Sequence, residues 1–195
     1  MPETGRMRLF AAVLPPAEAI DELAAAVDRL RTLPGNEGLR WTGHDGWHFT
    51  LAFLGEVDEE LLPAVEERFG RAAARQAPFS LRLHGGGHFG RRALWAGAAG
   101  GLDAMRLLAD RADAAARRAG VAMDEHRAYK AHLTLARSRT GSDTDLRPYV
   151  DALAGFEGTA WTVSELALVR SNPPTAGVPG AQPRYELLRI WPLGH

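Results

Sequence analysis

A five-residue pattern occurs twice in this chain, as His-Phe-Thr-Leu-Ala at 48–52 and as His-Leu-Thr-Leu-Ala at 132–136. In a β-strand, successive side chains point to opposite faces of the sheet. Alternation therefore places the histidine and threonine of each copy on one face. Phe49, Leu51 and Phe53 of the first copy, and Leu133 and Leu135 of the second, are expected on the other face. The pattern predicts two strands, each with an apolar face for the core and a polar face for a site.

The spacing of the two copies indicates a duplicated fold. His48 and His132 lie 84 positions apart. Phe10 lies 38 positions before His48 and Trp95 lies 37 positions before His132, and each interval is predicted to run strand, helix, strand. Two such units pack most simply about a pseudo-twofold axis. Both polar faces are therefore expected to line one central cleft.

The remaining segments predict an α+β fold with mostly antiparallel sheets, because the glycine fingerprint of a doubly wound dinucleotide-binding fold is missing. A length of 195 residues suits one domain, 1–195, of two lobes. The expected strands are 8–14, 39–41, 47–54 (ended by Gly55), 79–83, 93–97, one around His132, 159–169 and 185–191. Four helices are expected. The first follows Pro16 and runs to Leu30, the second is capped by Asp58 and runs to Phe69, and the others cover 102–119 and 146–153. The expected loops are 84–88, 141–145 and 172–183.

Composition narrows the function classes. The chain has no cysteine, which excludes disulfides, thiolate nucleophiles and sulfur-ligated metal centres. Its net charge of −1 argues against a broad duplex-binding surface, although a local basic cleft remains possible. No apolar run is long enough to span a membrane, and the first residues lack a signal-peptide core. A monomeric, cytoplasmic protein without a membrane or obligate protein partner is expected.

The repeated side chains suit phosphoryl transfer without a metal or cofactor. The unperturbed pKa of histidine is about 6.5, so near neutrality one of His48 and His132 can act as base while the other acts as acid. Thr50 and Thr134 can donate hydrogen bonds to phosphate oxygens, whose negative charge must be stabilised during the reaction. A single His-x-Thr in a chain of this size is close to chance, but two matching copies are not.

Two other histidine pairs have the four-residue spacing of helical metal ligands, His44 with His48 and His84 with His88. Glycines inside both segments make a helix unlikely there. His44, His84 and His88 are therefore interpreted as loop residues, and no metal site is predicted.

The chain resembles the bacterial and archaeal RNA 2′,3′-cyclic phosphodiesterases, also called 2′-5′ RNA ligases, of the 2H phosphoesterase superfamily. The resemblance runs nearly end to end. One departure is Ala131, where the family usually has proline. The segments that carry the resemblance are 8–12, 48–55, 87–90, 94–97, 132–137 and 168–171.

This resemblance implies hydrolysis of a 2′,3′-cyclic phosphate at an RNA end to a 2′-phosphate, with possible reverse 2′-5′ ligation. It implies His48 as the general acid and His132 as the base, although the sequence alone is compatible with either assignment. Arg137 matches a phosphate ligand of the family, and an arginine fork suits phosphate. Strict alternation, however, puts Arg137 on the face opposite His132, so a bulge or strand end is required near Ala136.

Other readings stay open. Phe10 is a candidate for stacking on a base, with core packing as its alternative. The substrate is an RNA with a cyclic phosphate end or a small cyclic nucleotide such as ADP-ribose cyclic phosphate. An RNA-end binding module and a histidine-ligated metal hydrolase are the alternatives from other classes.

Overall fold

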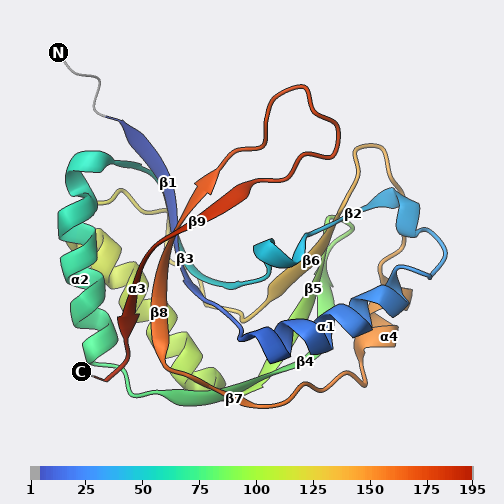
Figure 1. Cartoon of the computed structure of the whole chain (residues 1–195), viewed down its shortest axis with the longest axis horizontal. Helices are drawn as coiled ribbons and strands as arrows, with labels where there is room; N and C mark the ends of the chain where they lie inside the picture. The colour runs from blue at the N-terminus through green and yellow to red at the C-terminus, as the bar shows by residue number, and fades with distance from the viewer. Residues whose placement is uncertain (1–4, 195) are drawn as a thin grey trace.

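The computed structural model describes residues 5–194, which form two antiparallel sheets and four helices longer than one turn (Figure 1). Sheet A has the strand order β3-β1-β8-β9, and sheet B has the order β2-β6-β5-β4-β7. The strands are β1 (Arg6–Val13), β2 (Leu39–Trp41), β3 (Phe49–Asp58), β4 (Phe79–Phe89), β5 (Ala93–Gly100), β6 (Leu133–Ser138), β7 (Trp161–Val163), β8 (Glu165–Asn172) and β9 (Arg184–Pro192). The helices are α1 (Ala17–Leu30), α2 (Leu62–Ala74), α3 (Leu102–Arg118) and α4 (Arg147–Leu153), with single 3-10 turns η1 (Asn36–Gly38), η2 (His44–Gly46) and η3 (Glu59–Leu61).

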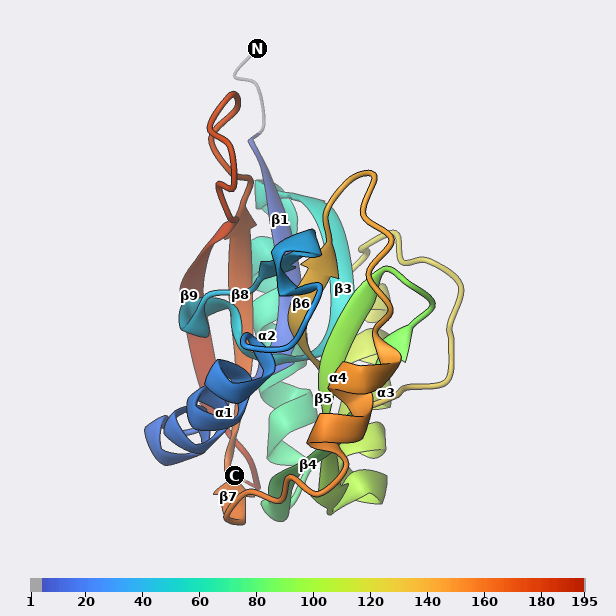
Figure 2. The same ribbon diagram turned by 90° about the vertical axis from the view of Figure 1, so that its right-hand side faces the viewer.

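Each sheet is covered by its own pair of helices. Helices α2 and α3 pack against sheet A, and α1 and α4 pack against sheet B (Figures 1 and 2). The main core is continuous between the two lobes, because buried residues of both sheets and all four helices belong to one cluster. The predicted fold class, with mostly antiparallel sheets in two lobes, is confirmed. No helix among residues 5–194 is long and apolar enough to cross a membrane.

The strand pairing repeats between the sheets. Ala12 of β1 pairs with Thr50 of β3, and Trp95 of β5 pairs with Thr134 of β6. The residue equivalent to Trp95 is therefore Ala12. Phe10, which the similar intervals had matched with Trp95, lies two residues before the true counterpart, so that predicted equivalence is wrong.

The predicted loop at 84–88 is wrong, because these residues belong to β4. Gly86, Gly87 and His88 pair with β5, after a register shift that begins at Leu83. A Cβ atom on Gly87 would overlap the indole of Trp95, and one on Gly86 would lie 2.7 Å from the Trp95 carbonyl oxygen. The glycines therefore permit close packing of Trp95 within the sheet and do not form a loop.

Three other boundaries differ from the prediction. β3 begins after His48 and continues through Gly55, which adopts a φ of 68° at an irregular position opposite Leu9. Asp58 ends β3 and pairs with Arg6, and its side chain does not cap the 3-10 turn that follows. The segment 159–169 divides into β7 in sheet B and β8 in sheet A, because Ser164 lies where the chain passes from one sheet to the other.

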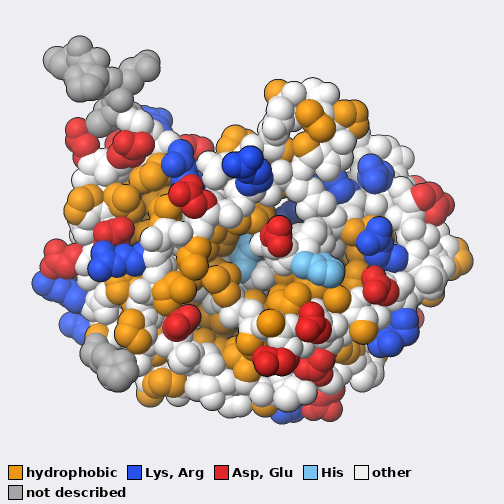
Figure 3. All heavy atoms as spheres, viewed as in Figure 1, with side chains coloured by type: hydrophobic (Ala, Val, Ile, Leu, Met, Phe, Trp, Pro, Cys, Tyr) orange, Lys and Arg blue, Asp and Glu red, His pale blue; other side chains and the backbone are white. Residues whose placement is uncertain are grey.

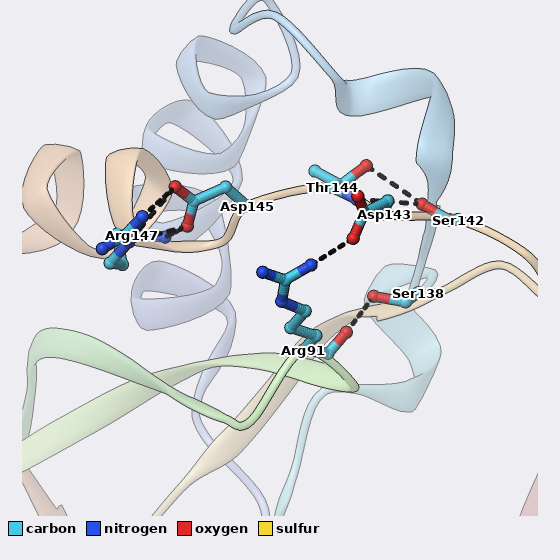
Figure 4. A network of polar contacts seen from close by, with 7 residues as sticks. All are labelled: Arg91, Ser138, Ser142, Asp143, Thr144, Asp145 and Arg147. Atoms are coloured by element: carbon cyan, nitrogen blue, oxygen red, sulfur yellow. Dashed lines mark hydrogen bonds and ion pairs between the residues drawn. The ribbon is translucent and has the colours of Figure 1, made fainter.

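The predicted surface loop before α4 is held by its own polar contacts (Figure 4). Arg91 forms an ion pair with Asp143, and the Ser142 and Thr144 hydroxyls lie 3.0 Å apart. The Thr144 hydroxyl also donates to the Gly35 carbonyl oxygen at 3.0 Å. These contacts attach the loop after β6 to the turn between α1 and η1 and to the turn after β4.

Candidate active site

The two histidines of the repeated pattern face one cavity of about 330 Å³ between the sheets. His48 immediately precedes β3 and His132 immediately precedes β6, so both lie at strand entrances and not inside the strands as predicted. Thr50 and Thr134 line the same cavity. Pale-blue histidine side chains are visible near the hollowed centre of the face in Figure 3. Segments 84 residues apart thus contribute matching side chains to one space.

Each imidazole has a backbone hydrogen bond to the residue two positions earlier. The Nδ1 atom of His132 lies 2.8 Å from the Lys130 carbonyl oxygen, and His48 bonds to the backbone of Gly46. A carbonyl oxygen only accepts, so Nδ1 of His132 is the donor. In the neutral ring Nε2 then carries the free lone pair. The bond prepares His132 to accept a proton through Nε2.

The pKa values of both histidines are lowered. The pKa of His48 is lowered to about 4, mainly by burial and in smaller part by the nearby charge of His132, against the opposing effect of the Gly46 hydrogen bond. Burial also lowers the pKa of His132, and the charges of Lys130 and Arg137 act in the same direction. The two sites therefore interact electrostatically. Two cations, Lys130 and Arg137, act on His132, and the charge of His132 acts on His48.

Aromatic rings surround each imidazole differently. Phe10 stacks on His48 with 4.6 Å between ring centroids and 26° between planes, and Tyr185 meets His48 edge-on at 5.3 Å. His132 contacts Phe89 edge-on at 4.9 Å. Phe10 lines the cavity, but its side chain is only 3% exposed and one ring face is covered by His48. It therefore orients His48, and contact with a substrate base stays a prediction.

Two β-bulges decide which side chains reach the cavity. In β6, Thr134 pairs with Trp95 and Ala136 pairs with Leu94, so Leu135 is the extra residue. Leu135 and Ala136 are both fully buried, and Arg137 returns to the cavity face. The bulge that Arg137 requires is present.

The same irregularity in β3 overturns the predicted orientation of Phe53. Thr50 pairs with Ala12 and Ala52 pairs with Ala11, so Leu51 is extra. Phe53 therefore points into the cavity and is 65% exposed, whereas alternation had placed it in the core. Phe53 and Arg137 occupy matching positions, five residues after their histidines.

The cavity also contains residues that the sequence did not single out. Arg8 lies two positions before Phe10 on β1, and alternation along that strand was a signal that could have found it. Ser171 and Tyr185 face each other across β8 and β9 beside Arg8. Arg137 and Arg8 both act on the pKa of the Tyr185 hydroxyl, which burial raises overall. No local pattern marks Tyr185, because only the pairing of distant strands brings it here.

The loop between β8 and β9 closes one side of the cavity, and Pro173, Pro174 and Pro183 line it. The Gln182 amide nitrogen donates to the Trp41 carbonyl oxygen at 2.7 Å. Its amide oxygen accepts from the Gly43 backbone nitrogen at 2.9 Å. A single side chain thus connects this loop to the segment that leads to His48.

The other histidines lie outside this arrangement. His44 is in η2 and packs on Trp47, while His84 and His88 belong to β4. Across residues 5–194, no group of three or more His, Asp or Glu side chains is placed to share a metal ion.

Comparison with known proteins adds to this geometry. The LigT like Phosphoesterase family model matches residues 13–95 and 98–179, so each matched segment contains one histidine–threonine motif. The RNA 2′,3′-cyclic phosphodiesterase of Thermus thermophilus is 34% identical over 179 residues, covering 85% of this chain and 82% of the relative. That of Geobacillus stearothermophilus is 31% identical over 157 residues, covering 78% of this chain, which spans about half (47%) of the relative's length.

A solved structure agrees over the whole fold. The crystal structure of Escherichia coli LigT complexed with 3′-AMP has a TM-score of 0.76 and 28% identity, covering 98% of this chain and 100% of that chain. The match extends through both sheets and both histidine motifs. The chain therefore belongs to the LigT-like phosphoesterase family.

Proposed function

We propose that this protein hydrolyses the 2′,3′-cyclic phosphate at an RNA end to a 2′-phosphate and a 3′-hydroxyl, without a metal ion. Membership of the phosphoesterase family supports cyclic phosphodiester hydrolysis, and the relatives named above are RNA 2′,3′-cyclic phosphodiesterases. The observation that carries the proposal is the shared cavity, in which two histidines meet two threonines and two arginines, Arg8 and Arg137. This set combines two groups for proton transfer with donors for the phosphate oxygens.

The proposed step is an in-line displacement. Nε2 of His132 accepts a proton from water as the water oxygen attacks phosphorus. The bond between phosphorus and O3′ breaks, and His48 protonates the departing O3′. One water is consumed, and proton exchange with solvent then restores the charge states of the two rings. Thr50, Thr134 and Arg137 donate hydrogen bonds to the non-bridging oxygens, where negative charge increases in the transition state.

The assignment of base and acid follows the family resemblance, and the hydrogen bond from Nδ1 of His132 to the Lys130 carbonyl oxygen supports it because Nε2 is left free to accept a proton. Lys130 and Arg137 disfavour a proton on His132, which therefore stays neutral as a base requires. The pKa of His48 is lowered to about 4 in the free protein, mainly by burial, so His48 gains its proton when the anionic substrate binds. An anionic phosphodiester bound between the rings raises the pKa of both imidazoles, and the proton that His48 then carries is the one that it transfers to O3′.

The same arrangement accommodates ligation. With the 5′-hydroxyl of a second RNA in place of water, attack on phosphorus and departure of O3′ would form a 2′-5′ linkage. The acid and base keep their roles, because only the nucleophile changes. This reaction is part of the proposal and is tested with the same cyclic-ended RNA.

Product analysis on an RNA with a defined 2′,3′-cyclic end tests the proposal. We expect a 2′-phosphate, and a 3′-phosphate would show that the other ester bond breaks. His48→Ala and His132→Ala should each lower turnover by about 10²- to 10⁴-fold, the usual contribution of a general acid or base. His84→Ala, outside the cavity, is the matched control. Activity that EDTA abolishes and zinc or manganese restores would overturn the metal-independent scheme.

Two further substrates separate the alternatives. Sulfur in place of O3′ gives a leaving group that departs without protonation, so the defect of His48→Ala should shrink strongly while that of His132→Ala persists. Equal defects on both substrates would contradict the assignment. Turnover of a cyclic mononucleotide alone would favour a small-nucleotide enzyme, and tight RNA binding without product would favour a binding module.

A further inference from the structure

A second cavity, of about 290 Å³, lies between α2 and α3, the two helices packed on the face of sheet A opposite the active site. Both helices are labelled in Figure 1. Its lining includes five arginines, Arg68, Arg71, Arg75, Arg111 and Arg118, but only one acidic residue, Asp110. The chain as a whole has a net charge of −1. Positive charge is therefore concentrated in this groove, which we call the arginine groove.

The spacing along both helices builds the arginine groove. Arg68, Arg71 and Arg75 are three and four positions apart, so they lie on one side of α2. Arg111 and Arg118 are seven positions apart on α3 and face them. The floor consists of alanines, which leave room between the helices. Like charges held this close oppose one another, which raises the free energy of the folded protein unless an anion is bound.

Two of the five arginines have structural partners. Arg71 pairs with Glu67 on the same helix. Arg111 donates to the Arg75 carbonyl oxygen at 2.6 Å, where α2 ends, and to the amide oxygen of the buried Gln76 at 2.9 Å. Arg111 therefore fastens α3 to the end of α2, and Gln76 holds its guanidinium in place.

The other three guanidinium groups are available to a ligand. Among residues 5–194, no carboxylate lies within ion-pair distance of Arg68, Arg75 or Arg118. The carboxylate of Asp110 lies 3.5 Å from the imidazole of His126, outside the groove lining. The acidic side chain of the lining therefore has a partner elsewhere.

We propose that the arginine groove binds the phosphate backbone of the RNA substrate, as a second contact away from the cavity that holds the cyclic end. This inference rests on the proposed function for the identity of the polymer. The groove lining contains no aromatic side chain on which a base can stack, so recognition is through phosphates and independent of sequence. Arg68 to Arg75 covers about 10 Å of helix at 1.5 Å per residue, which suits an extended chain of phosphates better than a single compact anion.

The test measures binding of a single-stranded RNA ending in a 3′-hydroxyl, by fluorescence anisotropy over a range of salt concentrations. The test variant combines Arg68→Gln, Arg75→Gln and Arg118→Gln. The control variant combines Arg29→Gln, Arg31→Gln and Arg139→Gln, which removes the same charge from exposed positions away from the groove. Hydrolysis of a cyclic mononucleotide is measured on all three proteins.

We expect the groove variant to bind RNA at least tenfold more weakly at low salt. The slope of log affinity against log salt should fall by about two, because each phosphate contact on a single strand contributes about 0.7. The losses of affinity and of salt slope in the control variant should be less than a third of those in the groove variant. Mononucleotide turnover should be the same in all three proteins. Equal losses in both variants, or unchanged affinity and slope in the groove variant, would overturn the proposal.

Two outcomes identify which proposal has failed. Stabilisation by tripolyphosphate in a thermal melt, without measurable RNA binding, would overturn the assignment to RNA and leave a site for small phosphate chains. RNA binding that depends on the groove, in a protein that does not cleave cyclic phosphates, would support the groove and reject the proposed function.

Discussion

Arg137 lies on the same face of β6 as Thr134, although the two residues are three positions apart. Simple alternation would put them on opposite faces. The bulge at Leu135 buries two successive side chains, Leu135 and Ala136, and brings the guanidinium to the cavity. Bulges next to active sites commonly redirect a side chain in this way.

Replacing Arg137 should weaken phosphate binding in the transition state. Arg137→Gln is expected to lower kcat/KM for a cyclic mononucleotide by about 10- to 100-fold, because a hydrogen bond to a charged group contributes about 1.5–3 kcal/mol. Arg137→Lys should lie between the two, since lysine keeps the charge but not the planar fork. Steady-state kinetics measure the effect, and Arg139→Gln, just beyond β6, is the control. Equal kinetics for Arg137→Gln and the wild type would remove Arg137 from the site.

The pH dependence of kcat/KM should be bell-shaped with its maximum on the acidic side of 6.5. The singly protonated pair is the active form, and its population is greatest between the two pKa values. Both histidine pKa values are lowered from 6.5 in the free protein, that of His48 to about 4. Activity should therefore fall toward higher pH as the remaining proton is lost, and toward lower pH as both rings become charged. A maximum above pH 7 in kcat/KM would contradict the lowered values.

The buried His48 should make the fold less stable in acid. Its folded pKa of about 4 lies below the unfolded value of about 6.5, so the unfolded chain binds the extra proton between these pH values. The free energy of unfolding should fall as pH decreases from 6.5 to 4, by up to about 3 kcal/mol from this group. The free energy of unfolding, measured with urea at several pH values in this window, should depend less steeply on pH for His48→Gln than for the wild type. His84→Gln, outside the cavity, should keep the pH dependence of the wild type. An unchanged pH dependence in His48→Gln would rule out His48 as the cause of the acid destabilisation.

Removing the Gln182 side chain should loosen the β8–β9 loop over the cavity. Gln182→Ala loses both hydrogen bonds to the 41–43 segment, each contributing about 1 kcal/mol at most in an exposed position. We expect KM to rise by about threefold to tenfold with kcat nearly unchanged, because the loop positions substrate and provides no reacting group. Thr175→Ala in the same loop, whose side chain makes no such connection, is the control. A fall in kcat alone would assign Gln182 a different role.

Much of the site could be predicted from sequence, because its chemistry is local. His48, Thr50, His132 and Thr134 belong to two short strings, and the period of two along a strand gives their common face without any knowledge of the fold. Helices α1 and α3 were also predictable within a few residues, since an apolar stripe with glycine or proline after it depends only on nearby residues. The fold class followed from the order of these segments.

The side-chain orientations and contacts that the sequence could not predict depend on pairing between distant strands. Alternation predicts the orientation of a side chain only while the hydrogen-bond register is regular, so the bulge at Leu51 turned the Phe53 side chain to the face opposite the predicted one. The glycines of β4 were explained only by the Trp95 ring that packs on them. Tyr185 reaches the cavity because β9 pairs with β8 in sheet A, and Gln182 contacts Trp41 and Gly43 because the loop before β9 crosses to that segment. The sequence determined which groups are available for the chemistry. Only tertiary structure decided which of them meet and how their pKa values move, because burial and neighbouring charge are properties of the packed molecule.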